Sequence, residues 1–263
     1  MNQQPHRARK RFGQNFLHDQ AIIGRIVTAI SPTADDTLVE IGPGLGALTA
    51  PLLEAAGKMQ AIEIDRDLIA RLPEAMAPHG ELTLHEQDAL KADLNTLFPG
   101  EHKLRVVGNL PYNISTPLLF HLCDQIERIA DMHFMLQKEV VERMAAGPGS
   151  KTYGRLSVML QYHCQVVPLF VVKPGAFNPP PKVDSAIIRL KPHATAPYEI
   201  GDYKAFQQLV TQCFSQRRKT LRNAVNGIAA LEDIEACGLD PTSRPETLSG
   251  EDFGKLSLLL SKK

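Results

Sequence analysis

Apolar residues recur along this chain with two alternating spacings, and the alternation predicts an α/β fold. Short apolar runs rich in β-branched residues are typical of buried strands, and apolar residues three or four positions apart are typical of helices. The expected helices of the first two thirds include residues 22–30, 47–53 and 138–144. The expected strands are residues 37–41, 59–64, 82–85, 104–107, 132–136, 157–167 and 185–190.

The last two expected strands are separated by a loop and not by a helix. The separator, residues 173–181, contains glycine and several prolines and has no long helical pattern. Parallel neighbours need a long crossover connection, whereas two strands joined by a loop can pair antiparallel. We therefore expect a mostly parallel sheet with an antiparallel closing strand.

The composition changes at residues 191–197, and a domain boundary is expected there. Beyond this segment the apolar residues recur at helical spacing. One helix is expected to end at Gly238, and Ser249 is expected to cap the last one. The sequence thus predicts an α/β domain with a basic N-terminal arm at residues 1–193 and a small all-helical domain at 194–263.

Composition narrows the class of protein. The chain has 263 residues, enough for one large and one small domain, with 43% hydrophobic and 22% charged residues, as in ordinary globular proteins. No apolar run reaches the roughly 18 residues of a membrane span, and the N-terminus lacks the apolar stretch of a signal peptide. The four cysteines are scattered without a CxxC pair, which argues against zinc and a disulfide framework. We expect a cytoplasmic protein with no metal and no membrane partner.

The formal net charge of zero conceals two basic blocks without acidic residues. One is the N-terminal arm, and the other lies in residues 203–231. Such blocks are typical of a protein that contacts a polyanion over part of its surface, although a solvated arm and a solvated helix face would give the same pattern. Their basic residues include Arg7, Arg9, Lys10 and Arg11, and Lys204, Arg217, Arg218, Lys219 and Arg222.

Four of the expected strands end in or just before a residue suited to a ligand site. These residues are Gly42, Glu63, Asp88 and Asn109, spaced by about one strand–helix unit. Because carboxyl ends of parallel strands meet at one edge of a sheet, all four should line one crevice. Asp88 taken alone could instead be a helix N-cap.

A glycine turn follows the first strand of this set. In residues 42–46 (GPGLG), the missing side chains of Gly42 and Gly44 would let the backbone approach a ligand at a helix N-terminus. The Glu63 carboxylate could accept both hydroxyls of a ribose. The same spacing satisfies the dinucleotide fingerprint, so this unit alone does not separate a nicotinamide cofactor from S-adenosylmethionine.

Asn109-Leu110-Pro111-Tyr112 ends the fourth strand with residues suited to a flat heteroaromatic ring. The Asn109 side-chain oxygen and the adjacent carbonyl can accept both protons of one exocyclic NH2, proline fixes the turn, and tyrosine offers a stacking face. The plainer alternative is a turn in which Asn109 bonds its own backbone. Phe177, in a loop rich in glycine and proline, could clamp the second face of the ring or belong to a local apolar cluster.

Together with residues 12–17 (FGQNFL), which could pack the arm or form a lid over a ligand, these motifs closely resemble the ribosomal RNA adenine dimethyltransferases. The resemblance covers essentially the whole chain. It implies a Rossmann-like class I methyltransferase fold, S-adenosyl-L-methionine as cofactor, and dimethylation of two adjacent adenosines near the 3′ end of small-subunit (16S) ribosomal RNA. The matching blocks are ARKRFGQNFL, EIGPGLGALT, GNLPYNISTPL, MLQKEVVERM, YGRLSV, PPPKVDSAIIRL and QRRKTLRN.

The resemblance also implies a role for individual residues. The implied partner is the ribosomal RNA, free or in a 30S precursor, and we expect a monomer. The cofactor residues would be Asn15, Leu17, Gly42, Gly44, Glu63, Asp88 and Asn109. The catalytic set would be Asn109, Leu110, Pro111, Tyr112 and Phe177, with the target adenine between the two aromatic rings. The RNA-binding residues would be Arg217, Arg218, Lys219 and Arg222, joined by Arg9, Lys10 and Arg11 of the arm.

Three other functions compete with this one. A non-catalytic RNA-binding factor in ribosome assembly could keep the fold, but the intact polar residues at every strand end argue for catalysis. A nicotinamide-dependent oxidoreductase is permitted by the glycine turn but has no use for residues 109–112. A DNA adenine methyltransferase would have nearly the same site chemistry, and only the whole-chain resemblance and the C-terminal domain favour RNA.

Overall fold

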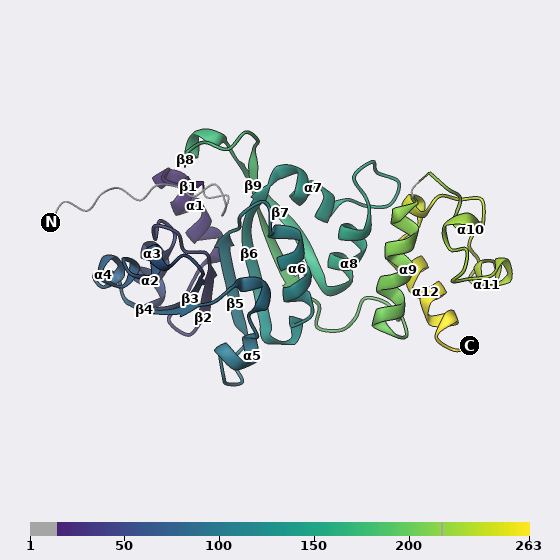
Figure 1. Ribbon diagram of the computed structural model, residues 1–263, viewed down its shortest axis with the longest axis horizontal. Coiled ribbons are helices and arrows are strands. Elements are labelled where there is room, and N and C mark those ends of the chain that lie inside the picture. The colour runs from purple at the N-terminus through teal and green to yellow at the C-terminus, as the bar shows by residue number, and fades with distance from the viewer. Residues whose placement is uncertain (1–14, 217) are drawn as a thin grey trace. The chain divides into compact units, whose positions relative to one another are not determined.

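The computed structural model describes residues 15–216 and 218–263, and the chain divides into two compact units (Figure 1). The first unit contains the chain up to Val141 together with Val167–Pro192. The second contains Glu142–Val166 and His193–Lys263. None of the helices in the described ranges has the length and apolar character needed to cross a membrane.

A seven-stranded sheet is the framework of the α/β fold, with the strand order β4-β3-β2-β5-β6-β9-β7. The pairs β2–β3, β3–β4, β2–β5 and β5–β6 are parallel, and β6–β9 is antiparallel. This confirms the expected mostly parallel sheet with an antiparallel closing strand. The strands are β2 (Thr37–Ile41), β3 (Lys58–Glu63), β4 (Glu81–Glu86), β5 (Leu104–Asn109), β6 (Ile129–Gln137), β7 (Cys164–Val172) and β9 (Ser185–Pro192).

The strand order reverses direction between β2 and β5. From β2 the chain adds β3 and β4 on one side, and then continues with β5 on the other side of β2. In open α/β sheets the crevice at such a switch point, outside the carboxyl ends of the strands, is where ligands bind. Gly42 follows β2 directly and Asn109 ends β5, so the two residues flank this point.

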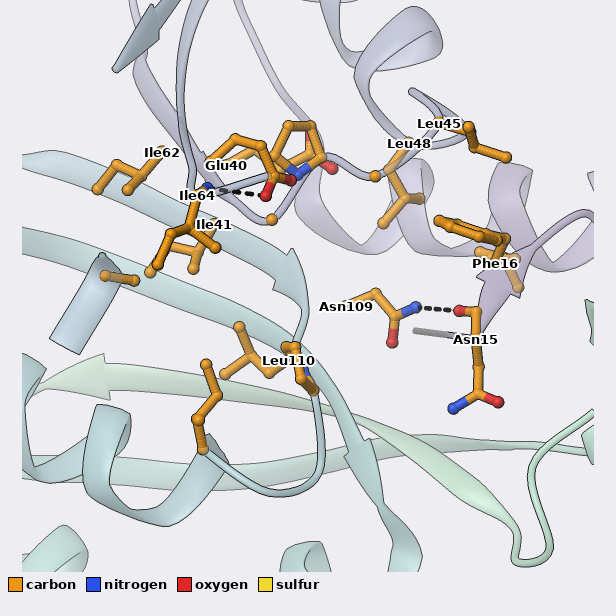
Figure 2. Close-up of a pocket in the computed structure, with 18 of the residues that line it drawn as sticks. Asn15, Phe16, Glu40, Ile41, Leu45, Leu48, Ile62, Ile64, Asn109 and Leu110 are labelled. Carbon is orange, nitrogen blue, oxygen red and sulfur yellow. Dashed lines mark hydrogen bonds between the residues drawn. The ribbon is translucent and has the colours of Figure 1, made fainter. Parts of the chain in front are cut away.

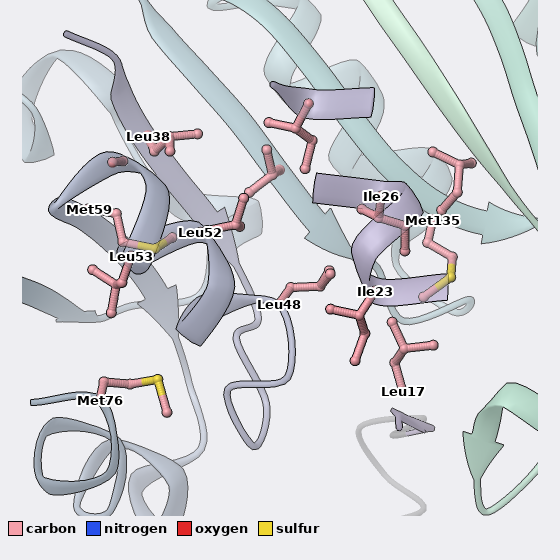
Figure 3. Close-up of a cluster of buried hydrophobic side chains, with 14 of the residues drawn as sticks. Leu17, Ile23, Ile26, Leu38, Leu48, Leu52, Leu53, Met59, Met76 and Met135 are labelled. Carbon is pink, nitrogen blue, oxygen red and sulfur yellow. The ribbon is translucent and has the colours of Figure 1, made fainter. Parts of the chain in front are cut away.

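Helices supply the apolar faces that cover the sheet, and Figure 3 shows the resulting cluster. Ile23, Ile26 and Ile30 of α1 are buried at the helical spacing that predicted this helix, and the Asp19 carboxylate caps its first turn. Full burial of each such side chain stabilises the fold by about 1.5–3 kcal/mol. The helices are α1 (Gln20–Ile30), α2 (Thr49–Ala56), α3 (Arg66–Ile69), α4 (Leu72–Met76), α5 (Leu94–Leu97) and α6 (Ser115–Cys123), with short 3-10 helices η2 (Ala89–Lys91), η3 (Ile126–Arg128) and η4 (Pro174–Ala176).

A separate two-stranded sheet joins the start of the described chain to a distant loop. Strand β1 (Phe16–Leu17) pairs antiparallel with β8 (Phe177–Asn178), with Leu17 opposite Phe177. The His18 N–H extends the pairing by donating to the carbonyl oxygen of Ala176 at 2.9 Å.

The second unit is mostly helical, as expected of the C-terminal part. The Ser249 side chain caps α12, and Gly238, with φ of 71°, follows α11, which confirms both of the predicted helix ends. Its helices are α8 (Arg155–His163), α9 (Tyr203–Ser215), α10 (Leu221–Ala224), α11 (Leu231–Ala236) and α12 (Gly250–Leu260), with the 3-10 helix η5 (Pro245–Thr247), while α7 (Lys138–Ala145) spans the division between the units.

The expected strand at 157–167 is wrong over most of its length. This segment continues α8 as far as His163, and only from Cys164 does it form β7. The buried residues of α8 form one short run, Leu156 to Leu160, that is apolar except for Ser157, and such a run fits a helix or a strand equally well. Strand β7 is last in the sheet order, an edge position that tolerates Pro168.

The division of the chain also differs from the single expected boundary. It falls between Pro192 and His193, one residue before the expected place, but Glu142–Val166 lies with the C-terminal helices. The reason is aromatic packing inside the second unit. The ring of Tyr162 lies 5.4 Å from that of Phe206, and the ring of Tyr153 lies 5.8 Å from that of Phe214.

Candidate active site

A cavity of about 280 Å³ lies at the carboxyl ends of β2, β3, β4 and β5 (Figure 2). The structure brings together there almost all residues that the sequence predicted for the cofactor and the reaction. All are in the first unit. They are Asn15, Leu17, Gly42, Gly44, Glu63, Asp88, Asn109, Leu110, Pro111 and Tyr112.

The glycine turn forms one wall of this cavity. Gly42 and Gly44 have φ of 68° and 59°, a region that favours glycine. A Cβ on Gly42 would meet no atom within 4 Å, and one on Gly44 would lie 3.4 Å from the Phe16 ring. The turn therefore presents bare backbone to the cavity, and α2 begins shortly after it, at Thr49.

Glu63, the last residue of β3, presents a nearly buried carboxylate that is 7% exposed. Its Oε1 accepts hydrogen bonds from the backbone N–H groups of Ile64 and Asp65, both at 2.8 Å. Burial raises the pKa of Glu63, and these backbone bonds act in the opposite direction. A carboxylate has lone pairs for further donors, so Glu63 can still accept from hydroxyl groups of a ligand.

Glu40 also lines the cavity, and the sequence reasoning missed it. It is 2% exposed, and the hydroxyl of Thr49 donates to its Oε2 at 2.7 Å. Burial raises the pKa of Glu40 to about 7, Thr49 opposes that shift, and the charge of Glu63 adds to it. A charged residue inside an apolar strand, one position from its end, was the signal that could have revealed it.

Asn109 has a defined side-chain orientation. Its Nδ2 donates to the carbonyl oxygen of Asn15 at 3.1 Å, across the cavity wall shown in Figure 2. A carbonyl oxygen can only accept, so the amide nitrogen must face Asn15 and Oδ1 must face away from it. The Leu110 N–H donates to the carbonyl oxygen of Met135 at 3.1 Å, which fixes the next peptide as well.

Tyr112 is held at its far end. Its hydroxyl shares a hydrogen bond of 2.7 Å with Oγ of Ser185, the first residue of β9. Ser185 is wholly buried. Burial raises the pKa of Tyr112, so the phenol remains protonated at neutral pH. From the sequence, Tyr112 was predicted to offer a stacking face, and its hydrogen bond to Ser185 was not predicted.

Asp88 combines the two alternatives that the sequence left open. Its Oδ1 accepts from the Leu90 N–H at 3.0 Å and so caps η2. The residue also lines the cavity, next to Gln87. The capping bond uses one carboxylate oxygen and leaves the other for a ligand.

Phe177 is placed apart from the cavity. Its side chain is 3% exposed and belongs to the apolar cluster that contains Leu17 and Met135. Among the described residues that line the cavity, Phe177 is absent. In this structure it is thus part of an apolar cluster, and its role as the second face of a base clamp stays a prediction.

The expected RNA-binding residues are described only in part. Arg218 and Lys219 are exposed in the turn after α9, and Arg222 is exposed on α10. Arg217, Arg9, Lys10 and Arg11 lie outside the described residues. Within the second unit, a polar groove of about 610 Å³ runs along α9. It is lined by Arg155, Lys204, Gln207, Gln208, Thr211, Gln212, Ser215, Gln216 and Asn226.

Comparison with known proteins places these features in one family. The chain is 58% identical over 253 residues to the ribosomal RNA small subunit methyltransferase A of Nitrosococcus oceani, with 96% of each chain covered. It is 55% identical over 261 residues to the protein of the same name from Pseudomonas syringae pv. syringae, covering 99% of this chain and 97% of the relative.

Solved structures agree with this similarity and with the class I methyltransferase fold. A dimethyladenosine transferase from Plasmodium falciparum has a TM-score of 0.78 at 29% identity, over 92% of this chain and 95% of that one. The 23S rRNA methyltransferase ErmE has a TM-score of 0.73 at 25% identity, over 94% and 99%. The family profile described as ribosomal RNA adenine dimethylase matches residues 5–262. The chain belongs to the ribosomal RNA adenine dimethylase family.

Proposed function

We propose that this chain transfers methyl groups from S-adenosylmethionine to the 6-amino nitrogens of two adjacent adenosines near the 3′ end of 16S ribosomal RNA, during assembly of the small subunit. Adenine dimethylation of ribosomal RNA is the activity of its family. The observation that carries the proposal for the site is the Asn109 side chain, whose amide nitrogen is bound to Asn15 so that Oδ1 is left to accept.

The residues of the cavity fit S-adenosylmethionine. Gly42 and Gly44 offer backbone without side chains, and Glu63 offers a carboxylate to the ribose hydroxyls. Asp88 would face the adenine of the cofactor, with Asn15 and Leu17 over it. When bound, the cofactor supplies an electrophilic methyl group on a positively charged sulfur. The carboxylates of Glu40 and Glu63 favour that positive charge when they are ionised.

The reacting amine needs help because its lone pair is delocalised into the adenine ring. Two acceptors, Oδ1 of Asn109 and the Leu110 carbonyl, can each receive one N–H bond of that amine. Together they hold the N–H bonds out of the conjugated geometry and stabilise the positive charge that develops on nitrogen. The extra proton leaves readily after alkylation, so no strong base is required. Orientation of the two bound partners contributes the rest of the rate.

The target base must leave its stack to reach this cavity. Stacking on an aromatic ring contributes about 1–3 kcal/mol per base, and Tyr112 offers such a ring beside Asn109. If Phe177 supplies the second face, its ring must first leave the cluster that it shares with Leu17 and Met135. The proposed base clamp therefore includes a rearrangement of β8.

The RNA would bind along the second unit. Arg218, Lys219 and Arg222 are exposed cations that can neutralise phosphates, and the adjacent groove along α9 contains Arg155 and Lys204. We further propose that Arg217 and the N-terminal arm extend this surface, and that the substrate is the RNA within a 30S precursor particle. We also propose that the chain acts as a monomer.

The deciding experiment is methylation of small subunits that lack the modification. Wild-type protein and Asn109→Ala would be incubated with labelled S-adenosylmethionine, and the modified nucleotides would be mapped. Wild-type protein should label two adjacent adenosines, and the rate of methyl transfer by the variant should be lower by orders of magnitude. If wild-type protein binds the particle but transfers no methyl group, the chain is a non-catalytic assembly factor. Labelling at another position would contradict the proposed substrate.

A further inference from the structure

Ser185 lies at the active-site edge of the sheet because its strand runs antiparallel. Asn109, at the end of β5, is opposite Met135 of the parallel strand β6. Gln137, at the end of β6, is opposite Ser185, the first residue of β9. A parallel strand in the place of β9 would have its last residue, and not its first, opposite Gln137. The reversed direction of β9 is therefore what delivers a serine hydroxyl to the side of the sheet where Tyr112 lies.

Tyr112 is tied to the protein at both ends. The hydroxyl of Ser115 donates to its backbone carbonyl at 3.1 Å, and Ser185 holds the phenolic oxygen at 2.7 Å. Ser185 is wholly buried, whereas Tyr112 is only half-buried. A half-buried aromatic ring would otherwise be free to swing about its Cα–Cβ bond. The phenolic oxygen lies on the long axis of the ring, so its bond to Ser185 restrains the ring against swinging about the Cα–Cβ bond.

We infer that Ser185 is a positioning residue for the methyl transfer, whose hydroxyl fixes the position of the Tyr112 ring against which the reacting adenine stacks. Ser185 does not touch the base and acts only through the tyrosine. The inference rests on the proposed function and adds a residue to that same site. A base that stacks on a fixed ring arrives with its amine directed at Oδ1 of Asn109, while a base that stacks on a swinging ring does so for a fraction of the time.

The competing explanation is a bond that only supports the fold. The two explanations differ in what the tyrosine hydroxyl contributes. If the bond is structural, its loss lowers thermal stability, and the turnover of the remaining folded protein is normal. If the bond positions the ring, its loss lowers kcat, leaves the affinity for the cofactor product unchanged, and gives the same effect whichever hydroxyl is removed.

The test uses Ser185→Ala, Tyr112→Phe and the double variant of the full chain, assayed on small subunits that lack the modification. Each single variant should lower kcat on the order of tenfold. The double variant should be no slower than the slower single variant, because both changes remove one interaction. The affinity for S-adenosylhomocysteine, measured by calorimetry, should match that of wild type in all three.

Ser157→Ala is the matched control, because Ser157 is also wholly buried and its hydroxyl donates to a backbone carbonyl, that of Arg143 in the second unit. Its kcat should remain that of wild type. Near-normal kcat in Tyr112→Phe, or single effects that multiply in the double variant, would overturn the inference. An inactive wild-type protein would instead defeat the proposed function, so the two failures are distinguishable.

Discussion

The backbone carbonyl of Asn15 and the side-chain amide of Asn109, 94 positions apart in the chain, are joined by a hydrogen bond of 3.1 Å. The bond gives the amide a direction, because only its nitrogen can face the carbonyl. The backbone at Asn15, beside the cofactor cavity, thereby sets the direction of Oδ1 of Asn109, the proposed acceptor. Orientation at this site depends on contacts between distant parts of the sequence.

Asn109→Asp tests this orientation more sharply than removal of the side chain. The variant keeps an acceptor but loses the amide nitrogen that donates to Asn15, and one carboxylate oxygen would face a carbonyl oxygen. Methyl transfer should fall by about 10²–10³-fold, as for loss of an oriented dipole at a reaction centre. Single-turnover rates with saturating cofactor would measure this, and a variant as fast as wild type would show that the bond to Asn15 does not matter.

Phe177→Leu separates the two roles of the buried aromatic. Leucine keeps most of the apolar volume in the cluster with Leu17 and Met135, so the free energy of unfolding should fall by only about 1–2 kcal/mol. The stacking face is lost completely, so kcat on the small subunit should fall. Urea denaturation and the methylation assay would be compared, and unchanged turnover would confine Phe177 to the core.

Glu40→Gln should change how stability depends on pH. Burial raises the pKa of Glu40 from 4.5 to about 7, so the folded state favours the protonated form. The associated stabilisation is complete below pH 4.5 and is lost as the pH rises through 7, by up to about 3 kcal/mol. Glutamine stays neutral, so urea denaturation from pH 4.5 to 8 should show a flatter profile for the variant.

The control for this pH effect is the exposed Glu74→Gln, which should keep the wild-type profile. A Glu40→Gln profile as steep as that of wild type would mean that the Glu40 carboxyl group does not titrate in this range.

Neutralising Arg218 and Lys219 together should weaken binding to the small subunit and lower its dependence on salt. Each phosphate contact that is lost should reduce the slope of log affinity against log salt by about one. Lys58→Ala, an exposed cation of the first unit, is the matched control. Filter binding over a range of salt would measure the slopes, and equal slopes for variant and wild type would move the RNA surface away from this turn.

Much of the fold could be predicted from local patterns of apolar residues. The strand at 37–41 and the strand that ends in Asn109 are buried apolar runs, and parallel topology then brings the residues at their ends to one edge. The bond between Tyr112 and Ser185 joins residues 73 positions apart, and no periodicity encodes such a pairing. The perturbed pKa of Glu40 likewise arises only once neighbouring strands and helices have removed water from its side chain.

The pairing of β1 with β8 also connects the cofactor cavity to the loop that contains Phe177. Leu17 borders the cofactor cavity, and its strand partner is Phe177. A rearrangement of β8 when the base enters would therefore be transmitted through this pairing to Leu17 beside the cofactor. We expect the affinity for the cofactor and the affinity for the nucleic acid to depend on each other.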